Sequence, residues 1–130
     1  MAVEKKLYSD FSLDFLAHPI TKKIRILKDN DAISQALKIL ILTDKYERLF
    51  QPNIFTNVRA TLFENFTPTT AEILNDYIYN ACRNYEKRAN ILDLQIIQDD
   101  DYNRIGVKIT YAGINTYNNI VVSVFLNKIR

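Results

Sequence analysis

The sequence predicts an α+β fold: a small antiparallel β-sheet, formed by a C-terminal three-strand meander and a short N-terminal strand, with two main helices packed on one face. Two observations lead to this prediction. Apolar residues recur at helical spacing in two segments before residue 86, whereas they alternate with other residues in three segments after residue 90. A chain of 130 residues is the usual size of one domain with one core. We therefore expect a single domain over residues 1–130.

The N-terminal part predicts an arm, a short strand and a first helix. Residues 1–20 mix aromatic and acidic side chains without clear periodicity and are interpreted as an N-terminal arm. Ile24 and Ile26 alternate with charged residues, which predicts a short, half-buried strand. The run Asp29-Asn30-Asp31 supplies side chains that can cap a helix. The helix that follows places its apolar residues on one stripe that faces the core: Ile33, Leu37, Leu40 and Ile41.

A polar segment that begins at Thr43 and contains Pro52 predicts a loop after this helix. Residues 58–63 then predict one or two helical turns, with Leu62 and Phe63 packing inward. This short helix is expected to connect the loop to the second main helix.

The second main helix has the clearest start signal in the chain. Thr67 suits the N-cap, and Pro68 suits the first helical position, where its missing N–H costs nothing. The helix is expected to run to about Tyr85. Its single cysteine, Cys82, is expected to be a buried, inert thiol. The residues at helical spacing are Ile73, Leu74, Tyr77, Ile78, Ala81, Cys82 and Tyr85.

Three alternating segments predict the strands of the meander. Turn-forming residues at 99–103 and 115–119 separate these segments, so an antiparallel arrangement is the simplest topology. The residues expected on one face are Leu92, Leu94 and Ile96 in the first segment, Ile105, Val107, Ile109 and Tyr111 in the second, and Ile120, Val122, Val124 and Leu126 in the third.

Composition and charge exclude several classes of protein. With 48% hydrophobic and 25% charged residues, the chain has the composition of an ordinary globular domain. A net charge of +2 is too weak to argue for a nucleic-acid partner. No apolar stretch approaches the roughly 20 residues that span a bilayer, so no membrane partner is expected. The start of the chain has no apolar region of a secretory signal, and we expect the protein to be made in a cytoplasm.

The sequence predicts no catalytic residue, no cofactor and no metal site. His18 is the one histidine, and two glycines are too few for a glycine-rich phosphate loop. Residues Asp99-Asp100-Asp101 are interpreted as a solvated hairpin tip rather than a cation site, because the spaced ligands of a calcium loop are missing. A facing pair of glycosidase carboxylates can be neither placed nor excluded.

Two segments have both a structural and a functional interpretation. The loop carries Arg48, Phe50, Pro52 and Phe55, and such residues either bind a partner or cover the core beneath the loop. The segment Tyr85-Glu86-Lys87-Arg88 ends the second main helix. Its two cations either interact with the helix dipole or contact a neighbouring protein.

Several short motifs in order along nearly the whole chain resemble the baseplate wedge and sheath-initiator family of contractile phage tails, which has relatives in phage-tail-like secretion machines and was once labelled lysozyme-like. The family's loop pattern, Gly-x-Arg-Pro-Phe-x-Pro-x-Phe-Gly, is matched at Arg48, Phe50, Pro52 and Phe55. Its Glu-Pro-Arg motif corresponds to Glu86-Lys87-Arg88. The further segments that carry the resemblance are Asp10-Phe11, His18-Pro19-Ile20, Asp31-Ala32-Ile33, Leu42-Thr43, Leu62-Phe63-Glu64, Thr67-Pro68-Thr69-Thr70-Ala71 and Asn84-Tyr85.

The chain departs from the family pattern at four positions. Tyr46 and Thr56 replace glycines, and Leu49 replaces a proline. Because neither Tyr46 nor Thr56 has glycine's tolerance of positive φ, the loop backbone is expected to follow a different course. Lys87 replaces the proline of the Glu-Pro-Arg motif, which removes a rigid residue but keeps both charges.

The resemblance implies a non-enzymatic subunit of the inner baseplate, present in multiple copies, that joins the wedge to the tail tube region and begins sheath polymerisation. The implied partners are other baseplate wedge proteins, tail tube or hub proteins and the tail sheath protein. The protein would be part of the virion tail and assemble in the host cytoplasm. The residues expected to contact partners are Arg48, Phe50, Pro52, Phe55, Glu86, Lys87, Arg88, Ile120, Val122 and Val124. The alternatives are a peptidoglycan-degrading, lysozyme-like tail enzyme and an unrelated intracellular adaptor.

Overall fold

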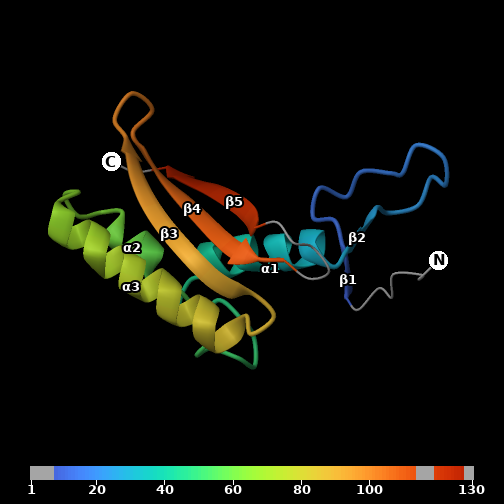
Figure 1. Ribbon diagram of the computed structural model, residues 1–130, viewed down its shortest axis with the longest axis horizontal. Helices are drawn as coiled ribbons and strands as arrows, with labels where there is room; N and C mark the ends of the chain where they lie inside the picture. The colour runs from blue at the N-terminus through green and yellow to red at the C-terminus, as the bar shows by residue number, and fades with distance from the viewer. Residues whose placement is uncertain (1–7, 114–118, 128–130) are drawn as a thin grey trace.

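The computed structural model describes residues 8–113 and 119–127 (Figure 1). The structure combines a three-stranded and a two-stranded antiparallel sheet with helices, which confirms the predicted α+β class. Among the described residues, no helix is long and apolar enough to cross a membrane. The elements in chain order are β1 (Ser9–Phe11), β2 (Ile26–Lys28), α1 (Asn30–Leu42), α2 (Val58–Thr61), α3 (Pro68–Tyr85), β3 (Asn90–Asp99), β4 (Arg104–Ala112) and β5 (Asn119–Asn127).

The larger sheet is the predicted meander, with strand order β3-β4-β5 and antiparallel pairing throughout. A tight turn after Asp99 joins β3 to β4, as the acidic run predicts. The second predicted turn, at residues 115–119, lies outside the described residues except for Asn119, which begins β5. Strand β4 is central, so β5 forms one edge of this sheet.

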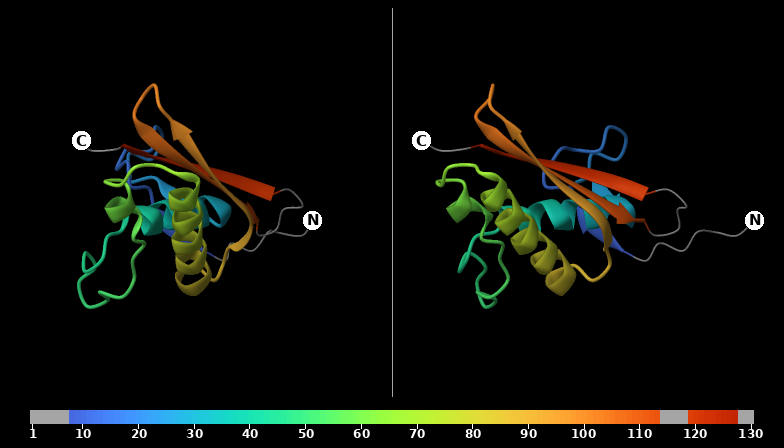
Figure 2. Two further views of the ribbon diagram at one scale, coloured as in Figure 1. Left: turned by 90° about the vertical axis from the view of Figure 1, so that its left-hand side faces the viewer. Right: turned by 60° about the vertical axis from the view of Figure 1, so that its left-hand side comes forward.

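All three helices lie on one side of the three-stranded sheet, and the core fills the space between the two layers (Figure 2). Alternate residues of β4 are completely buried there because the strand is central. The predicted stripe of α1 and the inner residues of β5 also face this core. The buried residues of these three elements include Ile33, Leu37, Leu40, Ile41, Ile105, Val107, Ile109, Tyr111, Val122, Val124 and Leu126.

The start of α1 is held by the sheet rather than by the predicted side-chain cap. The Tyr111 hydroxyl of β4 donates to the carbonyl of Asn30 at 2.9 Å and lies 2.7 Å from Ser34 Oγ. Asp29 occupies the N-cap position with a φ of 44°, but its side chain makes no capping bond there. Its carboxylate instead accepts the backbone N–H of Tyr8 at 3.1 Å. The predicted capping role of the aspartate was therefore wrong, although the helix begins where expected.

Helix α3 confirms its predicted bounds. The Thr67 hydroxyl accepts the N–H of Thr70 at 3.2 Å, and Pro68 occupies the first helical turn. Cys82 is fully buried, and burial raises the pKa of its thiol to about 12, with a smaller contribution from the charge of Glu86. The most deeply buried residues of this helix are Leu74, Ile78, Ala81 and Cys82.

Two predicted core residues point outward instead. Phe63 is 69% exposed, whereas its neighbour Leu62 is buried. Leu92 is 51% exposed because a β-bulge lies between Ile91 and Asp93, where the register shifts by one residue. The bulge makes Ile91, rather than Leu92, pack against the core beside Leu94 and Ile96.

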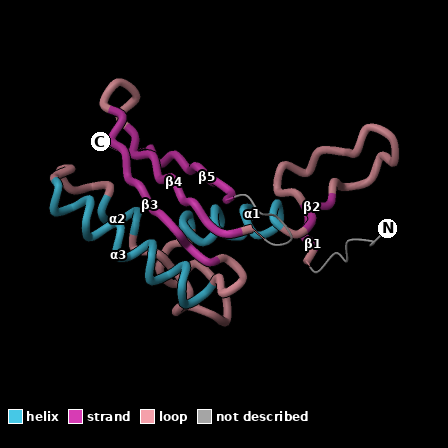
Figure 3. Tube along the Cα trace, in the orientation of Figure 1, coloured by secondary structure: helices cyan, strands magenta, loops and turns pink. Residues whose placement is uncertain are grey.

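The predicted N-terminal strand is β2, which begins at Ile26 and does not join the meander. Ile24 and Ile26 are 49% and 55% exposed, so the expectation of a half-buried strand was wrong. Strand β2 pairs with β1, a strand that lies inside the segment interpreted as an arm. The chain between them closes into a hairpin with a further antiparallel bridge between Ala17 and Ile24. Figures 1 and 3 show this hairpin extending away from the sheet and helices, next to one end of α1. The arm is thus a folded hairpin that continues to Lys28.

Candidate functional site

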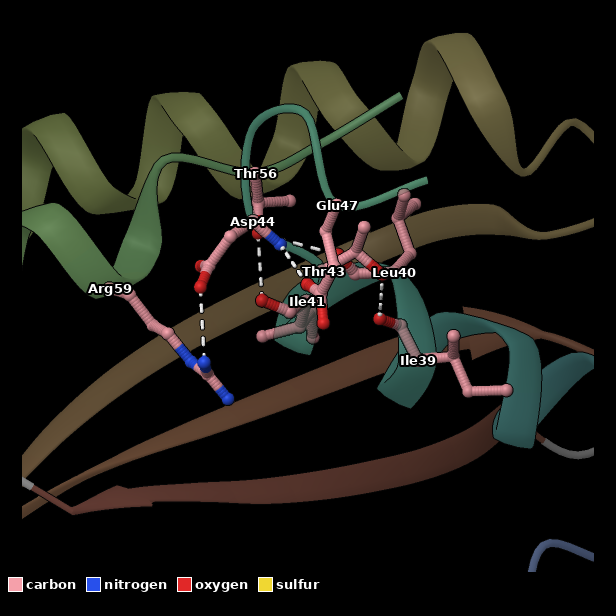
Figure 4. Close-up of polar contacts among 8 residues, drawn as sticks. All are labelled: Ile39, Leu40, Ile41, Thr43, Asp44, Glu47, Thr56 and Arg59. Atoms are coloured by element: carbon pink, nitrogen blue, oxygen red, sulfur yellow. Dashed lines mark hydrogen bonds and ion pairs between the residues drawn. The ribbon is translucent and has the colours of Figure 1, made fainter. Parts of the chain in front are cut away.

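The loop between α1 and α2 is fixed to the end of α1 by buried hydrogen bonds (Figure 4). Thr56 is only 2% exposed, and its hydroxyl donates to the carbonyl of Ile41 at 2.7 Å and lies 3.3 Å from that of Leu40. Its backbone N–H donates to the carbonyl of Thr43 at 3.2 Å. The last carbonyls of a helix need donors from outside the regular helical pattern. The carbonyl of Leu40 also accepts the backbone N–H of Thr43 at 3.3 Å, whereas the Thr56 hydroxyl supplies a donor to that of Ile41 and closes the base of the loop.

Further contacts fix the two sides of the loop. The N–H of Asp44 donates to Glu47 Oε2 at 2.7 Å, and the Asp44 carboxylate pairs with Arg59 Nη1 at 3.0 Å (Figure 4). The Tyr85 hydroxyl, at the end of α3, donates to the carbonyl of Asn53 at 2.7 Å. This last bond brings the loop and the end of α3 together. The two segments singled out in the sequence therefore lie side by side.

The tip of the loop exposes large apolar side chains. Phe50 is 100% exposed and Leu49 is 84% exposed, so Phe50 does not cover the core. Phe55 is half-buried, while Arg48 and Pro52 are exposed. The tip is therefore available for contact with another molecule, as the functional interpretation of the loop requires.

The backbone of the loop adopts conformations that favour glycine. Tyr46 has a φ of 65° and Phe50 a φ of 66°, both in the left-handed region. Tyr46 therefore adopts a positive φ although it replaces a glycine of the family pattern, whereas Thr56 does not. The Lys45 ammonium lies 5.1 Å from the centre of the Tyr46 ring and 5.6 Å from that of Phe55. These cation–π contacts help to hold the tyrosine in its strained conformation.

A groove runs between the loop and the C-terminal half of α3. It joins the exposed loop surface to the end of the helix that precedes Glu86. Most of its lining residues are aromatic or carry an amide side chain. The lining residues are Lys45, Phe55, Thr56, Asn57, Tyr77, Asn80, Ala81, Asn84 and Tyr85.

Glu86 and Arg88 bind each other at the end of α3. Arg88 donates from Nε to one carboxylate oxygen of Glu86 at 2.6 Å and from Nη2 to the other at 2.9 Å. Glu86 is 7% exposed, whereas Lys87 between them points to solvent. The bidentate pair raises the pKa of the Arg88 guanidinium, chiefly through the hydrogen bonds to Glu86. The sequence did not reveal this pair, since it placed both charges toward a partner.

Arg88 also extends toward the N-terminal hairpin. Its guanidinium carbon lies 5.0 Å from the centre of the Tyr8 ring, just before β1. The arginine side chain remains 33% exposed. The Glu86–Arg88 pair thus connects the end of α3 to the root of the hairpin while keeping part of the guanidinium accessible.

The third predicted contact segment lies on β5. Ile120 is half-buried, and Val122 and Val124 are 3% and 7% exposed, because all three face the helices. Their side chains therefore belong to the core, and only the main chain at this strand edge is open to a partner. The outward side chains of the strand include Val121 and Phe125, both more than half exposed.

The described residues contain no cluster of three or more histidine, cysteine or acidic side chains that could hold a metal ion. His18 Nδ1 accepts the backbone N–H groups of Ile20 and Thr21 at 3.2 and 3.3 Å, which is a turn-forming role. At the turn between β3 and β4, Asp99 pairs with Arg104 at 2.9 Å, and Asp100 accepts a hydrogen bond from Gln98.

Comparison with known proteins identifies the family. The family model of baseplate wedge protein gp25 matches residues 28–117. Baseplate wedge protein gp25 of Enterobacteria phage T4 is 34% identical over 121 residues, which cover 92% of this chain and 90% of that protein. The chain belongs to the baseplate wedge protein gp25 family. It is a structural baseplate wedge protein of a contractile phage tail or of a related baseplate, as the resemblance implied.

Solved structures share the fold of this gp25-family chain. A chain of the anti-feeding prophage baseplate, determined by cryo-EM with 6-fold symmetry, aligns with a TM-score of 0.71 at 21% identity, covering 85% of this chain and 89% of that one. A crystal structure described as a tail lysozyme from Geobacter sulfurreducens aligns with a TM-score of 0.63, also at 21% identity, covering 74% of this chain and 89% of that one. At this identity the likeness concerns the fold alone.

Proposed function

We propose that this gp25-family protein is a non-catalytic subunit of the inner baseplate that links the wedge to the tail tube region and starts polymerisation of the sheath. Its partners would be other wedge proteins, tube or hub proteins and the sheath protein, with assembly in the host cytoplasm. The 6-fold symmetry of the anti-feeding prophage baseplate supports a role in multiple copies. Family membership also replaces the alternative of an adaptor of unrelated origin.

The observation that carries the proposal is the free edge of β5. This strand is nine residues long and pairs only with β4 among the described strands. An edge of this length presents a row of unpaired N–H and C=O groups, which is a ready template for another strand. Because Val122 and Val124 hold the strand against the core, its edge is presented in a fixed position. Addition of a sheath strand there would give the first sheath subunit a defined orientation.

Electron microscopy of tails made without the protein tests this role. We expect tail tubes that lack a sheath, because the first sheath subunits would have no template. Normally sheathed tails in its absence would refute sheath initiation.

A pair of proline variants tests the β5 edge itself. Adjacent residues of an edge strand direct their N–H groups alternately to the paired and to the open side. One of the variants Val121→Pro and Val122→Pro therefore breaks the ladder with β4, and the other removes a donor from the open edge. The variant with the smaller fall in Tm should assemble into baseplates and fail to form a sheath. Full sheath formation by that variant would contradict the strand-addition step.

The surface formed by the loop and the end of α3 is proposed to contact neighbouring wedge proteins. Its exposed residues include Arg48, Phe50 and Pro52, and the adjoining segment contributes Lys87 and the accessible part of Arg88. The apolar tip supplies buried contact area, and the cations supply directed hydrogen bonds. Phe55 and Glu86 support this surface from beneath, because both are largely covered.

The name of the Geobacter protein keeps a lysozyme-like activity as the alternative. A glycosidase needs a carboxylic acid that donates a proton and a second carboxylate nearby. Glu86 is the buried carboxylate among the described residues, and Arg88 engages both of its oxygens. We therefore expect no fall in turbidity when the purified protein is added to cell walls. Lysis that a single Glu→Gln or Asp→Asn variant abolishes would favour the enzyme.

A further inference from the structure

The N-terminal hairpin exposes an unusual amount of apolar surface for a segment of its size. Seven of its large apolar residues are between 49% and 86% exposed, namely Phe11, Leu13, Phe15, Leu16, Ile20, Ile24 and Ile26. Exposed apolar side chains that gather on one face mark a contact with another molecule. Since the hairpin extends away from the sheet and helices, it can reach a neighbour that the body does not touch (Figures 1 and 3).

Strand geometry gathers part of this surface on one face of the hairpin. Phe11 and Ile26 are direct cross-strand neighbours, and Ile24 lies two residues from Ile26 on the same face. The opposite face meets the body, because Ser12 is only 6% exposed and Leu27 is half-buried. The outer face is therefore apolar, while the inner face fixes the hairpin.

A glutamine of α1 holds the hairpin in position. Gln35 Nε2 donates to the carbonyl of Phe11 at 2.7 Å and lies 3.3 Å from Asp10 Oδ2, while its Oε1 accepts the N–H of Leu13 at 3.1 Å. The amide side chain thus pairs with the main chain beside β1 much as a neighbouring strand would. Such fixing lowers the entropy lost on binding, so the hairpin is preorganised for a partner.

The charges of the hairpin indicate the chemistry of that partner. Lys22, Lys23 and Arg25 lie on its returning side, and no ion pair engages them among the described residues. On the outgoing side, Asp14 accepts hydrogen bonds from Ser12 and Leu16. These bonds, with a smaller contribution from the charge of Arg25, lower the pKa of its carboxyl group. Asp10 is likewise bonded within the protein. Lys22 and Lys23 therefore remain available to acidic groups outside the chain, whereas Arg25 already interacts electrostatically with Asp14.

The open edge of β2 favours a protein over a lipid surface. The backbone N–H of Ser12 donates to the Arg25 carbonyl, and that of Asp29 donates to the Tyr8 carbonyl. These bonds show which residue pairs of the β1–β2 ladder are hydrogen-bonded and which are not. By the alternation of antiparallel pairs, the N–H and C=O of Ile26 then point away from β1. Hydrocarbon offers no partner to such groups, whereas an extended protein segment does. A second copy is disfavoured, because two identical hairpins would bring their basic sides together.

We infer that the hairpin of residues 9–28 is a docking arm for a different baseplate protein, which binds it through an apolar surface rimmed by acidic side chains. The inference concerns a surface apart from the β5 edge and the loop, and it does not depend on sheath initiation. A partner on this arm would attach the subunit to a second neighbour, leaving β5 free.

Photo-crosslinking in assembled baseplates tests the arm. Benzoylphenylalanine is placed at Phe11 in the full chain, tails are assembled and irradiated, and crosslinked peptides of purified baseplates are identified by mass spectrometry. We expect crosslinks to one other baseplate protein, next to Asp or Glu residues. Crosslinks to a second copy of this chain, or no crosslink while a probe at Phe50 does react, would overturn the inference.

A charge reversal with a matched control provides the second measurement. The variant Lys22→Glu/Lys23→Glu should reduce incorporation into baseplates at least about tenfold, the effect of roughly 1.4 kcal/mol of binding free energy. The control Lys38→Glu/Lys108→Glu makes the same charge change at exposed sites of the body and should incorporate normally. Equal incorporation of both variants would contradict the inference. The inference would also be contradicted if the purified protein co-sedimented with phosphatidylglycerol vesicles and the charge reversal abolished this binding, since the arm would then bind a lipid surface.

Discussion

Single residues at the end of α3 show how a recognisable motif acquires its structure. Glu86 and Arg88 are two positions apart, and the sequence alone indicates charges near a helix end. Their bidentate bond depends on the turn that follows α3, where Glu86 leaves the helical conformation with a φ of −120°. Residue types could thus identify the motif, but the partner of each charge could be found only from the folded backbone.

The first prediction concerns this pair. Arg88→Ala should keep the protein folded and lower its free energy of unfolding by about 1–3 kcal/mol, because the largely buried Glu86 carboxylate loses both hydrogen bonds. The partial exposure of Arg88 places the effect toward the lower end of this range. Urea unfolding monitored by circular dichroism measures the change.

Lys87→Ala is the matched control for this variant. Lys87 is exposed, so its loss should change stability by less than about 0.5 kcal/mol. Arg88→Lys separates charge from geometry, since lysine cannot reproduce the two-point contact and should restore only part of the loss. A stability of Arg88→Ala equal to that of Lys87→Ala would mean that the ion pair does not stabilise the monomer.

At the scale of secondary structure, local signals predicted helices well because the responsible contacts are close in sequence. Thr67 and Pro68 define the start of α3 through bonds made within one helical turn. The sequence contains no comparable local signal for β1, because its three residues are held by β2 and Gln35, which are distant in the sequence. The bulge at Leu92 was hidden for the same reason, because the register of β3 is set by its pairing with β4.

The second prediction concerns the start of α3. Thr67→Ala should lower the free energy of unfolding by about 1 kcal/mol, because the N–H of Thr70 loses its acceptor. Thr67→Asn should keep most of the stability, since asparagine also caps helices. Thr69→Ala changes an exposed threonine in the same turn and should have little effect. Thermal melts measure the Tm of the three variants. Equal Tm values for Thr67→Ala and Thr69→Ala would exclude a capping role for Thr67.

At the scale of the whole molecule, the candidate surfaces arise from tertiary contacts. The loop and the end of α3 are joined by the bond from Tyr85 to Asn53, 32 positions apart in the chain. The sequence identified both segments by their residue types and by family resemblance, but it could not place them together. The sequence indicated an N-terminal arm, but it did not indicate a docking surface, because the exposure of the apolar side chains is visible only in the fold.

The third prediction uses two acidic groups in the core between the helices and the sheet. Burial raises the pKa of the Cys82 thiol from 9.0 to about 12, and it also raises that of the Tyr111 hydroxyl. Above about pH 9, the unfolded chain releases the thiol proton while the folded chain retains it. Deprotonation then favours unfolding, so stability should fall as the pH rises from 9 toward 12, by at most about 1.4 kcal/mol per pH unit for the thiol.

Urea unfolding between pH 7 and pH 10.5 measures this dependence, and Cys82→Ala isolates the contribution of the thiol. The variant starts from a different stability, but its free energy of unfolding should fall less steeply above pH 9, with Tyr111 accounting for part of the remaining slope. The native thiol should also react slowly with Ellman's reagent at pH 8 and rapidly in denaturant, because it is fully buried. Rapid reaction of the folded protein, or the same alkaline slope with and without Cys82, would show that the thiol is not enclosed as the core packing requires.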